Sequence, residues 1–291
     1  MKKFLKRTSL FLVTAAMTVS APLMAWALEH DIVILHTNDI HCGINDNIGF
    51  AGLAQIKKDA LARTPNVALV DAGDAIQGAP IGKLSRGLAV VDIMNYLGYD
   101  FCIPGNHEFD YGMDRFMELV PLQRAGYYCA NFVYAGNNKQ VLPGYKIMQY
   151  EDTKVAFVGA STPESLTTST PTFFQNEKSK YIYSFCEDKT GNKLYKQLQK
   201  NIDKARKDGA DYVFIVGHLG MDGTTPQWSS ESVAKNTQGV DAVIDGHSHE
   251  RFTRMVKNKV GKDVLLAQTG TKLKTVGELV ISPDGKLKSR L

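Results

Sequence analysis

The chain of 291 residues carries 34 lysines and arginines against 30 acidic residues, and 44% of its residues are apolar. Four of the basic residues and none of the acidic ones lie in positions 1–27, so positions 28–291 carry no net charge. This excludes a nucleic-acid-binding surface as the origin of the net charge of +4, and the composition excludes a disordered or fibrous chain.

The first 27 residues have the three parts of a secretory signal peptide. A basic stretch from Lys2 to Arg7 precedes an apolar stretch from Leu10 to Val19 and an A-x-A cleavage site at 25–27. An uncleaved membrane anchor is the alternative, but a span needs roughly 20 uninterrupted apolar residues. Thr14 and Thr18 interrupt this stretch, and Ser20 and Pro22 follow it. We therefore expect a signal peptide over 1–27 and an exported chain, periplasmic or secreted, over 28–291, with no membrane association after cleavage.

Apolar runs and helical patterns alternate along residues 28–291. Buried strands are predicted at Asp31–Leu35, Val67–Val70, Asp100–Ile103, Tyr127–Ala130, Tyr145–Gln149, Val155–Val158, Tyr212–Val216, Asp241–Ile244 and Val264–Ala267. Helices are predicted at Leu84–Leu97, Met113–Arg124 and Gly191–Asp208. The segment Ser161–Lys180, rich in serine, threonine and proline, predicts a long surface loop. With no repeat and no linker, this alternation predicts a single α/β layered domain.

Export would permit disulfide bonds, and the chain has four cysteines: Cys42, Cys102, Cys129 and Cys186. Two bridges in three possible connectivities are one interpretation. Two of these cysteines, however, lie in predicted buried strands, where a free thiol behaves as a small apolar group. We therefore expect buried thiols, since a chain of this length does not need disulfides for stability.

Polar clusters follow five of the predicted strands. They are Asp39-Ile40-His41, Asp74, Asn106-His107-Glu108, His218 and His247-Ser248-His249. In layered α/β proteins ligands bind where the carboxyl ends of strands converge. A single buried histidine is commonly satisfied by hydrogen bonds. Because five of the seven histidines fall in these clusters, the sequence predicts a metal centre.

The candidate ligands suffice for two divalent ions. One ion is expected on Asp39, His41 and His249, and the other on Asn106, His218 and His247, with Asp74 bridging. Nitrogen and oxygen ligands without thiolate favour Mn, Zn, Fe or Co over Ca. Two such ions about 4 Å apart can generate a nucleophilic hydroxide and hold the oxygens of an in-line displacement. Two aspartates and a bridging hydroxide would offset three of the four positive charges of such an ion pair. The positive charge that remains predicts an anionic small-molecule substrate.

His107 is the best candidate for a catalytic residue that binds no metal. It follows Asn106 directly, and Asp110 lies three residues further on, within reach of the second ring nitrogen. Such a pair can stabilise transition-state charge and protonate a leaving alkoxide. The alternative is a purely structural hydrogen bond near a helix start.

These motifs, in this order, resemble the signature of the calcineurin-like metallophosphoesterases. The longer sequence motifs at Gly73–Gly78 and Gly105–Gly112 are similar to those of the secreted 5′-nucleotidase family. The resemblance implies a four-layer α/β/β/α sandwich of the metallo-dependent phosphatase type. It also implies the seven metal ligands named above, a catalytic pair of His107 and Asp110, and hydrolysis of nucleotide phosphate monoesters. His249 stands where some members of the family have glutamine.

The resemblance leaves the substrate open. 2′,3′-Cyclic nucleotides and nucleotide-sugar pyrophosphates are alternatives, because the same metal site serves all three reactions. A non-catalytic metal-binding surface protein is a further alternative, against which the complete ligand set argues. The family's second, nucleotide-specificity domain is expected to be absent, with residues 28–291 forming the catalytic domain alone. Weak nucleobase discrimination is therefore expected.

Overall fold

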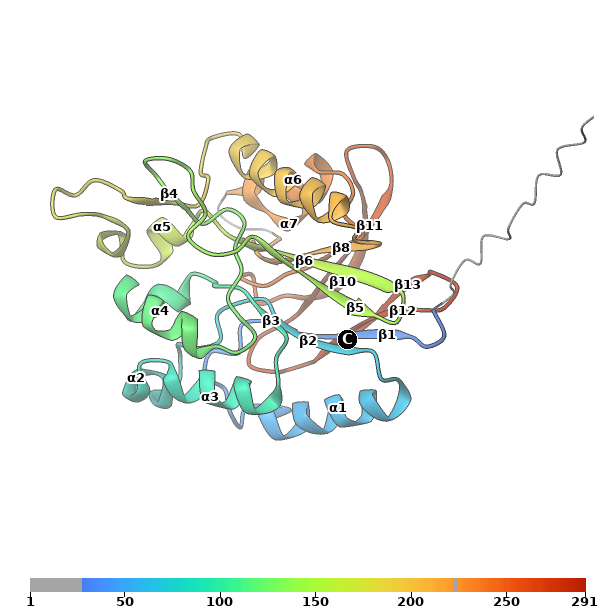
Figure 1. The fold of residues 1–291 in the computed structure, drawn as a ribbon. Helices are drawn as coiled ribbons and strands as arrows, with labels where there is room; N and C mark the ends of the chain where they lie inside the picture. Colours follow the sequence, from blue (N-terminus) through green and yellow to red (C-terminus); the bar gives the residue numbers. More distant parts are fainter. Residues whose placement is uncertain (1–27, 222–224) are drawn as a thin grey trace, which may run out of the picture.

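The computed structural model describes residues 28–221 and 225–291, and the predicted signal peptide lies outside them. Two β-sheets pack face to face with helices on both outer sides (Figure 1). The first sheet has the order β13 (Leu287–Arg290), β12 (Gly277–Ile281), β1 (Ile32–Thr37), β2 (Val67–Asp71), β3 (Phe101–Cys102). The second has the order β10 (Arg251–Lys257), β11 (Asp263–Thr269), β9 (Ala242–Ile244), β8 (Tyr212–His218), β6 (Thr153–Ser161), β5 (Tyr145–Tyr150).

An apolar layer fills the space between the two sheets. Phe101 of the first sheet and Phe157 and Phe214 of the second are fully buried there, with ring centroids 5.7 Å (Phe101–Phe157) and 6.0 Å (Phe157–Phe214) apart. The central strands β1, β2, β8 and β9 are buried almost throughout, which explains why they read as continuous apolar runs rather than as alternating patterns. The edge strands β10 and β13 expose several of their residues.

The helices form the outer layers. Helices α1 (Gly49–Arg63), α2 (Pro80–Ser85), α3 (Leu88–Leu97) and α4 (Met113–Leu119) lie on the side of the first sheet, and α6 (Asn192–Lys207) and α7 (Ser230–Asn236) cover the second (Figure 1). The predicted stripe of α6 is buried at Leu194, Leu198, Ile202 and Ala205. The predicted four-layer α/β/β/α sandwich is confirmed.

Three predicted elements differ in the structure. The segment Tyr127–Ala130 is not a strand: its successive amides donate to the carbonyls of Cys102, Pro143 and Gly159, so it crosses between the sheets instead of extending one. The predicted helix Leu84–Leu97 is two helices, because Arg86 and Gly87 adopt left-handed backbone with φ of 47° and 86°.

The third difference is at Met113–Arg124, where the α-helix ends at Leu119 and a short 3₁₀ turn, Val120–Leu122, follows. This turn contains Pro121, which has no amide hydrogen to donate to a helical bond. The predicted loop Ser161–Lys180 is partly ordered by α5 (Ser165–Thr168) and by a 3₁₀ turn, Pro171–Phe174, whose Phe174 is fully buried. A small two-stranded sheet pairs β4 (Val133–Tyr134) with β7 (Tyr183–Ser184).

All four cysteines are free and buried, in line with the expectation of buried thiols. Burial raises the pKa of the Cys42 thiol to about 12 and that of Cys186 to about 12 as well, so both stay protonated at neutral pH. Within the described part of the chain, no helix combines the length and apolarity needed to cross a membrane.

His36, one of the two histidines outside the predicted metal centre, is fully buried in β1. Neither ring nitrogen has a hydrogen-bond partner among the described residues, and burial lowers the pKa of this imidazole to about 3. The folded protein therefore keeps His36 neutral, whereas the unfolded chain binds a proton below pH 6.5.

This difference should make the fold acid-sensitive. Because the pKa of His36 is lower in the folded than in the unfolded protein, a change from pH 7 to pH 5 removes about 2 kcal/mol of the free energy of unfolding. We expect a His36→Leu variant to lose correspondingly less stability over that interval, as measured by urea unfolding at the two pH values. Equal losses in the two proteins would show that His36 does not titrate in this way.

Candidate metal centre

The candidate ligands converge at one edge of the sandwich because of the strand order. Strands β1, β2 and β3 are parallel to one another in the first sheet, as are β8 and β9 in the second. Asp39, Asp74 and Asn106 follow the first three strands, His218 ends β8, and the segment 247–249 follows β9. The convergence that the sequence predicts is present.

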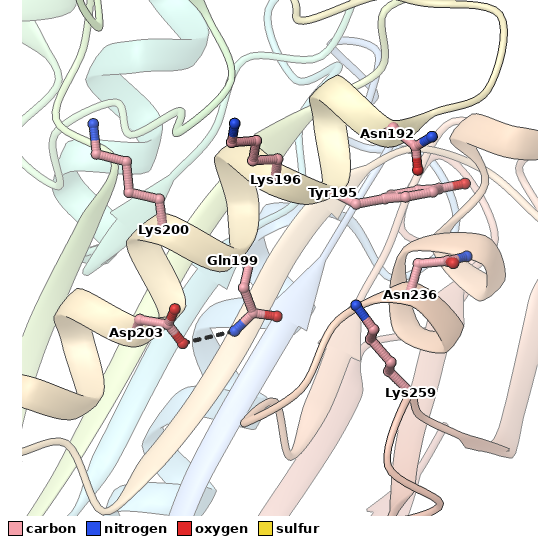
Figure 2. Close-up of a pocket in the computed structure, with 8 residues that line it drawn as sticks. All are labelled: Asn192, Tyr195, Lys196, Gln199, Lys200, Asp203, Asn236 and Lys259. Carbon is pink, nitrogen blue, oxygen red and sulfur yellow. Dashed lines mark hydrogen bonds between the residues drawn. The ribbon is translucent and has the colours of Figure 1, made fainter.

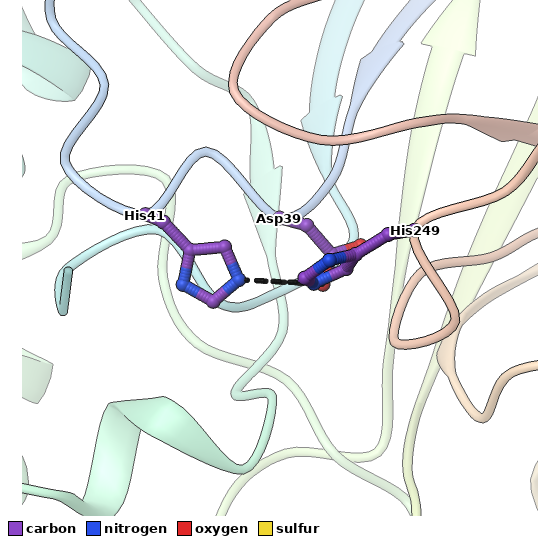
Figure 3. Close-up of side chains that lie close together, drawn as sticks. All are labelled: Asp39, His41 and His249. Carbon is purple, nitrogen blue, oxygen red and sulfur yellow. Dashed lines mark hydrogen bonds and ion pairs between the residues drawn. The ribbon is translucent and has the colours of Figure 1, made fainter.

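One group that could hold an ion consists of Asp39, His41 and His249. Figure 3 shows the two imidazoles pointing toward one another, with their Nε2 atoms 3.1 Å apart. Oδ1 of Asp39 lies 3.2 Å from Nε2 of His249 and 3.9 Å from Nε2 of His41. The Nδ1 atom of His41 lies 3.1 Å from the carbonyl of Gln77. Since a carbonyl only accepts, Nδ1 carries the hydrogen and Nε2 presents its lone pair to the group.

A second group consists of Asp39, Asp74 and His218. Nε2 of His218 is 3.0 Å from Oδ2 of Asp74, yet the two atoms lack hydrogen-bond geometry. The opposite nitrogen, Nδ1, donates to the carbonyl of Ala72 at 2.8 Å, so Nε2 is the nitrogen left to bind a proton or a metal ion. Oδ2 of Asp74 is also 4.0 Å from Nε2 of His41. Asp74 thus faces histidines of both groups, although Asp39 is the carboxylate that the two groups share.

The two remaining predicted ligands border the second group. Oδ1 of Asn106 is buried without a hydrogen-bond partner among the described residues, an arrangement that a cation would satisfy. The ring of His247 lies 5.1 Å from that of His218, and its Nε2 contacts Glu164 at 3.0 Å. That contact leaves Nδ1 of His247 as the nitrogen for a metal. The residues present therefore fit divalent cations held by nitrogen and oxygen atoms.

The backbone is strained where the candidate ligands lie. Five of the seven have positive φ, a region that residues other than glycine rarely occupy. They are Asp39 (50°), His41 (49°), Asp74 (58°), His247 (81°) and His249 (56°). Strain of this kind costs on the order of 1–3 kcal/mol per residue and concentrates at functional sites. The fold therefore places these side chains at a cost in stability.

The electrostatics of the cluster favour a bound positive charge. Burial alone would lower the pKa of His218, but the charges of Asp74 and Asp39 raise it to about 10. A hydrogen bond to Asp39 raises the pKa of His249 as well. Burial would raise the pKa of Asp74, but the neighbouring histidines lower it. The two buried carboxylates thus attract positive charge, whether a proton or a metal ion.

His107 and Asp110 form the predicted pair. Nδ1 of His107 lies 2.6 Å from Oδ2 of Asp110, and this hydrogen bond raises the pKa of His107 to about 9. The other carboxylate oxygen, Oδ1, accepts a hydrogen bond of 3.0 Å from Ser169. The ring of His107 is 5.3 Å from that of His41, and its backbone amide donates to Asp74 at 2.8 Å. The imidazolium of His107 is therefore held beside the candidate metal ligands His41 and Asp74.

Glu108 has a structural role that the sequence analysis did not assign. Its buried carboxylate accepts hydrogen bonds from the amides of Asp74 and Ala75 at 2.8 Å and of Gly105 at 2.6 Å. It thereby fastens the loop after β2 to the loop after β3. The sequence feature that could have indicated this role is the position of Glu108, directly after His107 and close behind a buried strand.

Glu164 was also missed, although it follows the carboxyl end of β6 as the predicted ligands follow other strands. Its carboxylate orients His247 through the 3.0 Å contact, and the residue is 7% exposed. Partners of this kind fix the tautomer and orientation of a metal-binding histidine.

Replacing Glu164 with alanine should weaken metal binding by about 10- to 100-fold, the usual effect of losing such a partner. Glu164→Gln keeps an oxygen that can accept from Nε2 and should retain most of the affinity. Metal titration by calorimetry checks both variants. Equal affinity in the alanine variant and the parent would rule out this orienting role.

A pocket between α6 and Lys259 lies apart from the candidate metal ligands (Figure 2). It has a volume of about 630 Å³, and its lining includes Tyr195, Lys196 and Lys200. None of the candidate ligands lines it. The lysines of α6 form a solvated face, as the amphipathic pattern predicts.

A two-sheet sandwich with a histidine and aspartate cluster at one edge fits the class of metal-dependent phosphoesterases. The family model of the calcineurin-like phosphoesterases matches residues 32–251, and the chain belongs to this family. It is therefore a member of a family of metal-dependent phosphoric ester hydrolases.

Among curated relatives, the snake venom 5′-nucleotidase of Gloydius brevicauda is 26% identical over 95% of this chain and 49% of its own length. The 2′,3′-cyclic-nucleotide 2′-phosphodiesterase/3′-nucleotidase of Haemophilus influenzae is 26% identical over 82% of this chain and 40% of its own length. Among solved structures, the 5′-nucleotidase precursor of Thermus thermophilus superposes with a TM-score of 0.74 at 25% identity. That superposition covers 89% of this chain and 53% of the other. This chain thus spans about half the length of these proteins.

Proposed function

We propose that the protein hydrolyses phosphate monoesters of nucleotides, as a phosphoesterase of the 5′-nucleotidase type that uses two divalent ions. The observation that carries this proposal is the convergence of Asp39, Asp74 and His218 beside the imidazolium of His107. Of the two relatives above, the one with the larger matched share is named a 5′-nucleotidase. Export of residues 28–291 after removal of the predicted signal peptide is part of the same proposal.

The division of the seven candidate ligands that the sequence predicts is part of this proposal. Asp39, His41 and His249 would hold one ion, and Asn106, His218 and His247 the other, with the carboxylate of Asp74 shared. Manganese, zinc, iron or cobalt fits this nitrogen and oxygen set. Bound there, the ions supply positive charge to the phosphoryl oxygens and lower the pKa of a water nucleophile.

The protein groups position and protonate the substrate. Asp110 accepts the Nδ1 hydrogen of His107, so the protonated Nε2 is free to donate to a phosphoryl oxygen and then to the leaving oxygen. Ser169 holds Asp110 from the other side and limits its rotation. Glu108 keeps the loops that carry Asp74 and Asn106 in register.

Hydrolysis of 2′,3′-cyclic nucleotides is the second candidate. The Haemophilus influenzae relative, whose name includes this activity, matches 82% of this chain. Nucleotide-sugar pyrophosphates use the same displacement at phosphorus and form a third. A metal-binding protein without catalysis is disfavoured, because it would have no use for an imidazolium that Asp110 holds beside the candidate ligands.

A substrate panel tests the proposal. The protein, reconstituted with Mn²⁺, is assayed for release of phosphate or product from AMP, 2′,3′-cyclic AMP, UDP-glucose and para-nitrophenyl phosphate. We expect turnover of AMP and of the aryl phosphate, with kcat/KM values of the same order. Turnover of the cyclic nucleotide alone would favour the second candidate. Failure on every ester would contradict catalysis.

A further inference from the structure

Asn38 lies directly before the candidate ligand Asp39, in the loop after β1, and is 1% exposed. Its Nδ2 donates to Oδ2 of Asp39 at 2.6 Å and to the carbonyl of Gly270 at 2.7 Å. Its Oδ1 accepts from the backbone amide of Thr269 at 2.9 Å and from the hydroxyl of the same residue at 2.5 Å. Both hydrogens and both lone pairs of the amide are in use, and the reversed amide would place its oxygen against two acceptors. The orientation of Asn38 is therefore fixed.

The contacts of Asn38 decide which oxygen of Asp39 faces the candidate metal centre. Besides accepting from Asn38, Oδ2 accepts from the backbone amide of His247, which lies closer to it (3.0 Å) than to Oδ1 (3.3 Å). Oδ1 lies 3.2 Å from Nε2 of His249 and 3.9 Å from Nε2 of His41 (Figure 3). The carboxylate cannot turn without breaking the two bonds to Oδ2, so Oδ1 is the oxygen that remains for a cation.

The turn after β11 holds the backbone of Asp39 as well. The carbonyl of Asp39 accepts from the amide of Lys272 at 2.8 Å and from the hydroxyl of Thr271 at 2.9 Å. Its amide donates to the carbonyl of Gly73 at 2.9 Å. These bonds stabilise its φ of 50°, which residues other than glycine rarely adopt. The end of β11 thus fixes the main chain of Asp39 directly and its carboxylate through Asn38.

We propose that Asn38 is a positioning residue that holds the carboxylate of Asp39 with Oδ1 toward the ion expected on His41 and His249. The proposal rests on the two-ion function proposed above, and it extends control of one ion to a residue that is not a candidate ligand. In the proposed division Asp39 serves that ion alone. Loss of Asn38 should therefore weaken one ion and spare the other, whereas a merely structural residue would not distinguish between them.

Metal titration measures this difference. Mn²⁺ is titrated by calorimetry into the EDTA-stripped parent protein and into the variants Asn38→Leu and Thr269→Val. Leucine has nearly the volume of asparagine but makes none of its four hydrogen bonds. Thr269→Val removes only the hydroxyl that donates to Oδ1 of Asn38, while the backbone amide of the residue remains.

The matched control is Asn66→Leu. Asn66 is also buried, at 6% exposure, and its Nδ2 donates to Glu151 at 2.8 Å. It directly precedes β2, whereas Asp74 follows the other end of that strand. This variant loses a buried amide far along the strand from the candidate ligands, so it should bind both ions as the parent does.

We expect Asn38→Leu to weaken one of the two Mn²⁺ ions by about 10- to 100-fold, the usual effect of losing a partner that orients a metal ligand. The affinity of the other ion should stay at the parent value. Thr269→Val should weaken the same ion by a smaller factor, because one bond to Oδ1 of Asn38 remains. This milder variant tests the proposal even if Asn38→Leu does not fold.

Two results would overturn the positioning role alone: parent affinities for both ions in Asn38→Leu, or an equal loss at both ions. If only Thr269→Val folds, parent affinities in that variant would overturn it. In each case two bound ions and turnover of AMP by the parent would leave the proposed function standing. A parent that binds no second ion, or that releases no phosphate from AMP, would overturn the proposed function and the positioning role together.

Discussion

Replacing Asp74 with alanine should remove both metal ions and reduce phosphoester hydrolysis by about a thousandfold or more. Its Oδ2 lies 3.0 Å from Nε2 of His218 and 4.0 Å from Nε2 of His41, so it faces both halves of the cluster. Bound metals contribute several kcal/mol to stabilisation of the transition state, and each 1.4 kcal/mol is about a factor of ten in rate. Metal analysis after gel filtration and phosphate release from AMP provide the two readouts.

The control for this variant is Asp284→Ala, which removes an exposed carboxylate from the turn between β12 and β13. It should bind metal and turn over substrate as the parent does. Full metal content in Asp74→Ala would show that Asp74 does not join the two ions. In that case Asp39, which belongs to both groups, would be the shared ligand.

Replacing His107 with alanine should lower kcat by about 100- to 10,000-fold while metal content stays the same, as is typical of lost acid–base catalysis. Its side chain contacts Asp110 at 2.6 Å, and its ring faces that of His41 at 5.3 Å. Asp110→Asn should lower kcat less, because the imidazole remains but loses the carboxylate that favours its protonated form.

These two variants separate catalysis from metal binding. Steady-state kinetics on para-nitrophenyl phosphate with metal analysis of the same samples is the measurement. Asp203→Asn, on the exposed face of α6, is a control of matched charge change and should behave as the parent. If His107→Ala lost metal in proportion to activity, the pair would be structural.

The grouping of the candidate ligands could be predicted from the sequence, because it depends on where buried parallel strands end. Buried parallel strands read as apolar runs, and the residues directly after them meet at one edge. Asp39, Asp74 and His218 could therefore be grouped although up to 179 positions separate them. The long helix α6 was predictable for a similar reason, since its apolar stripe has helical spacing.

What the sequence did not predict depends on tertiary contacts. The segment Tyr127–Ala130 is as apolar as a strand, but its amides bond to three separate partners. Helix α1 was missed, since Gly49 and Gly52 lie in its first turns and no side chain caps its N-terminus. The role of Glu164 depends on the approach of β6 to the loop after β9, which no local pattern encodes.

The central claim is that this cluster catalyses phosphoester hydrolysis with two metal ions. The most direct test strips the protein with EDTA, titrates Mn²⁺ back, and follows phosphate release from AMP at each step. We predict no hydrolysis in the stripped protein and a rate that saturates at two equivalents of bound Mn²⁺. Hydrolysis that survives stripping, or that does not return with Mn²⁺, would contradict the claim.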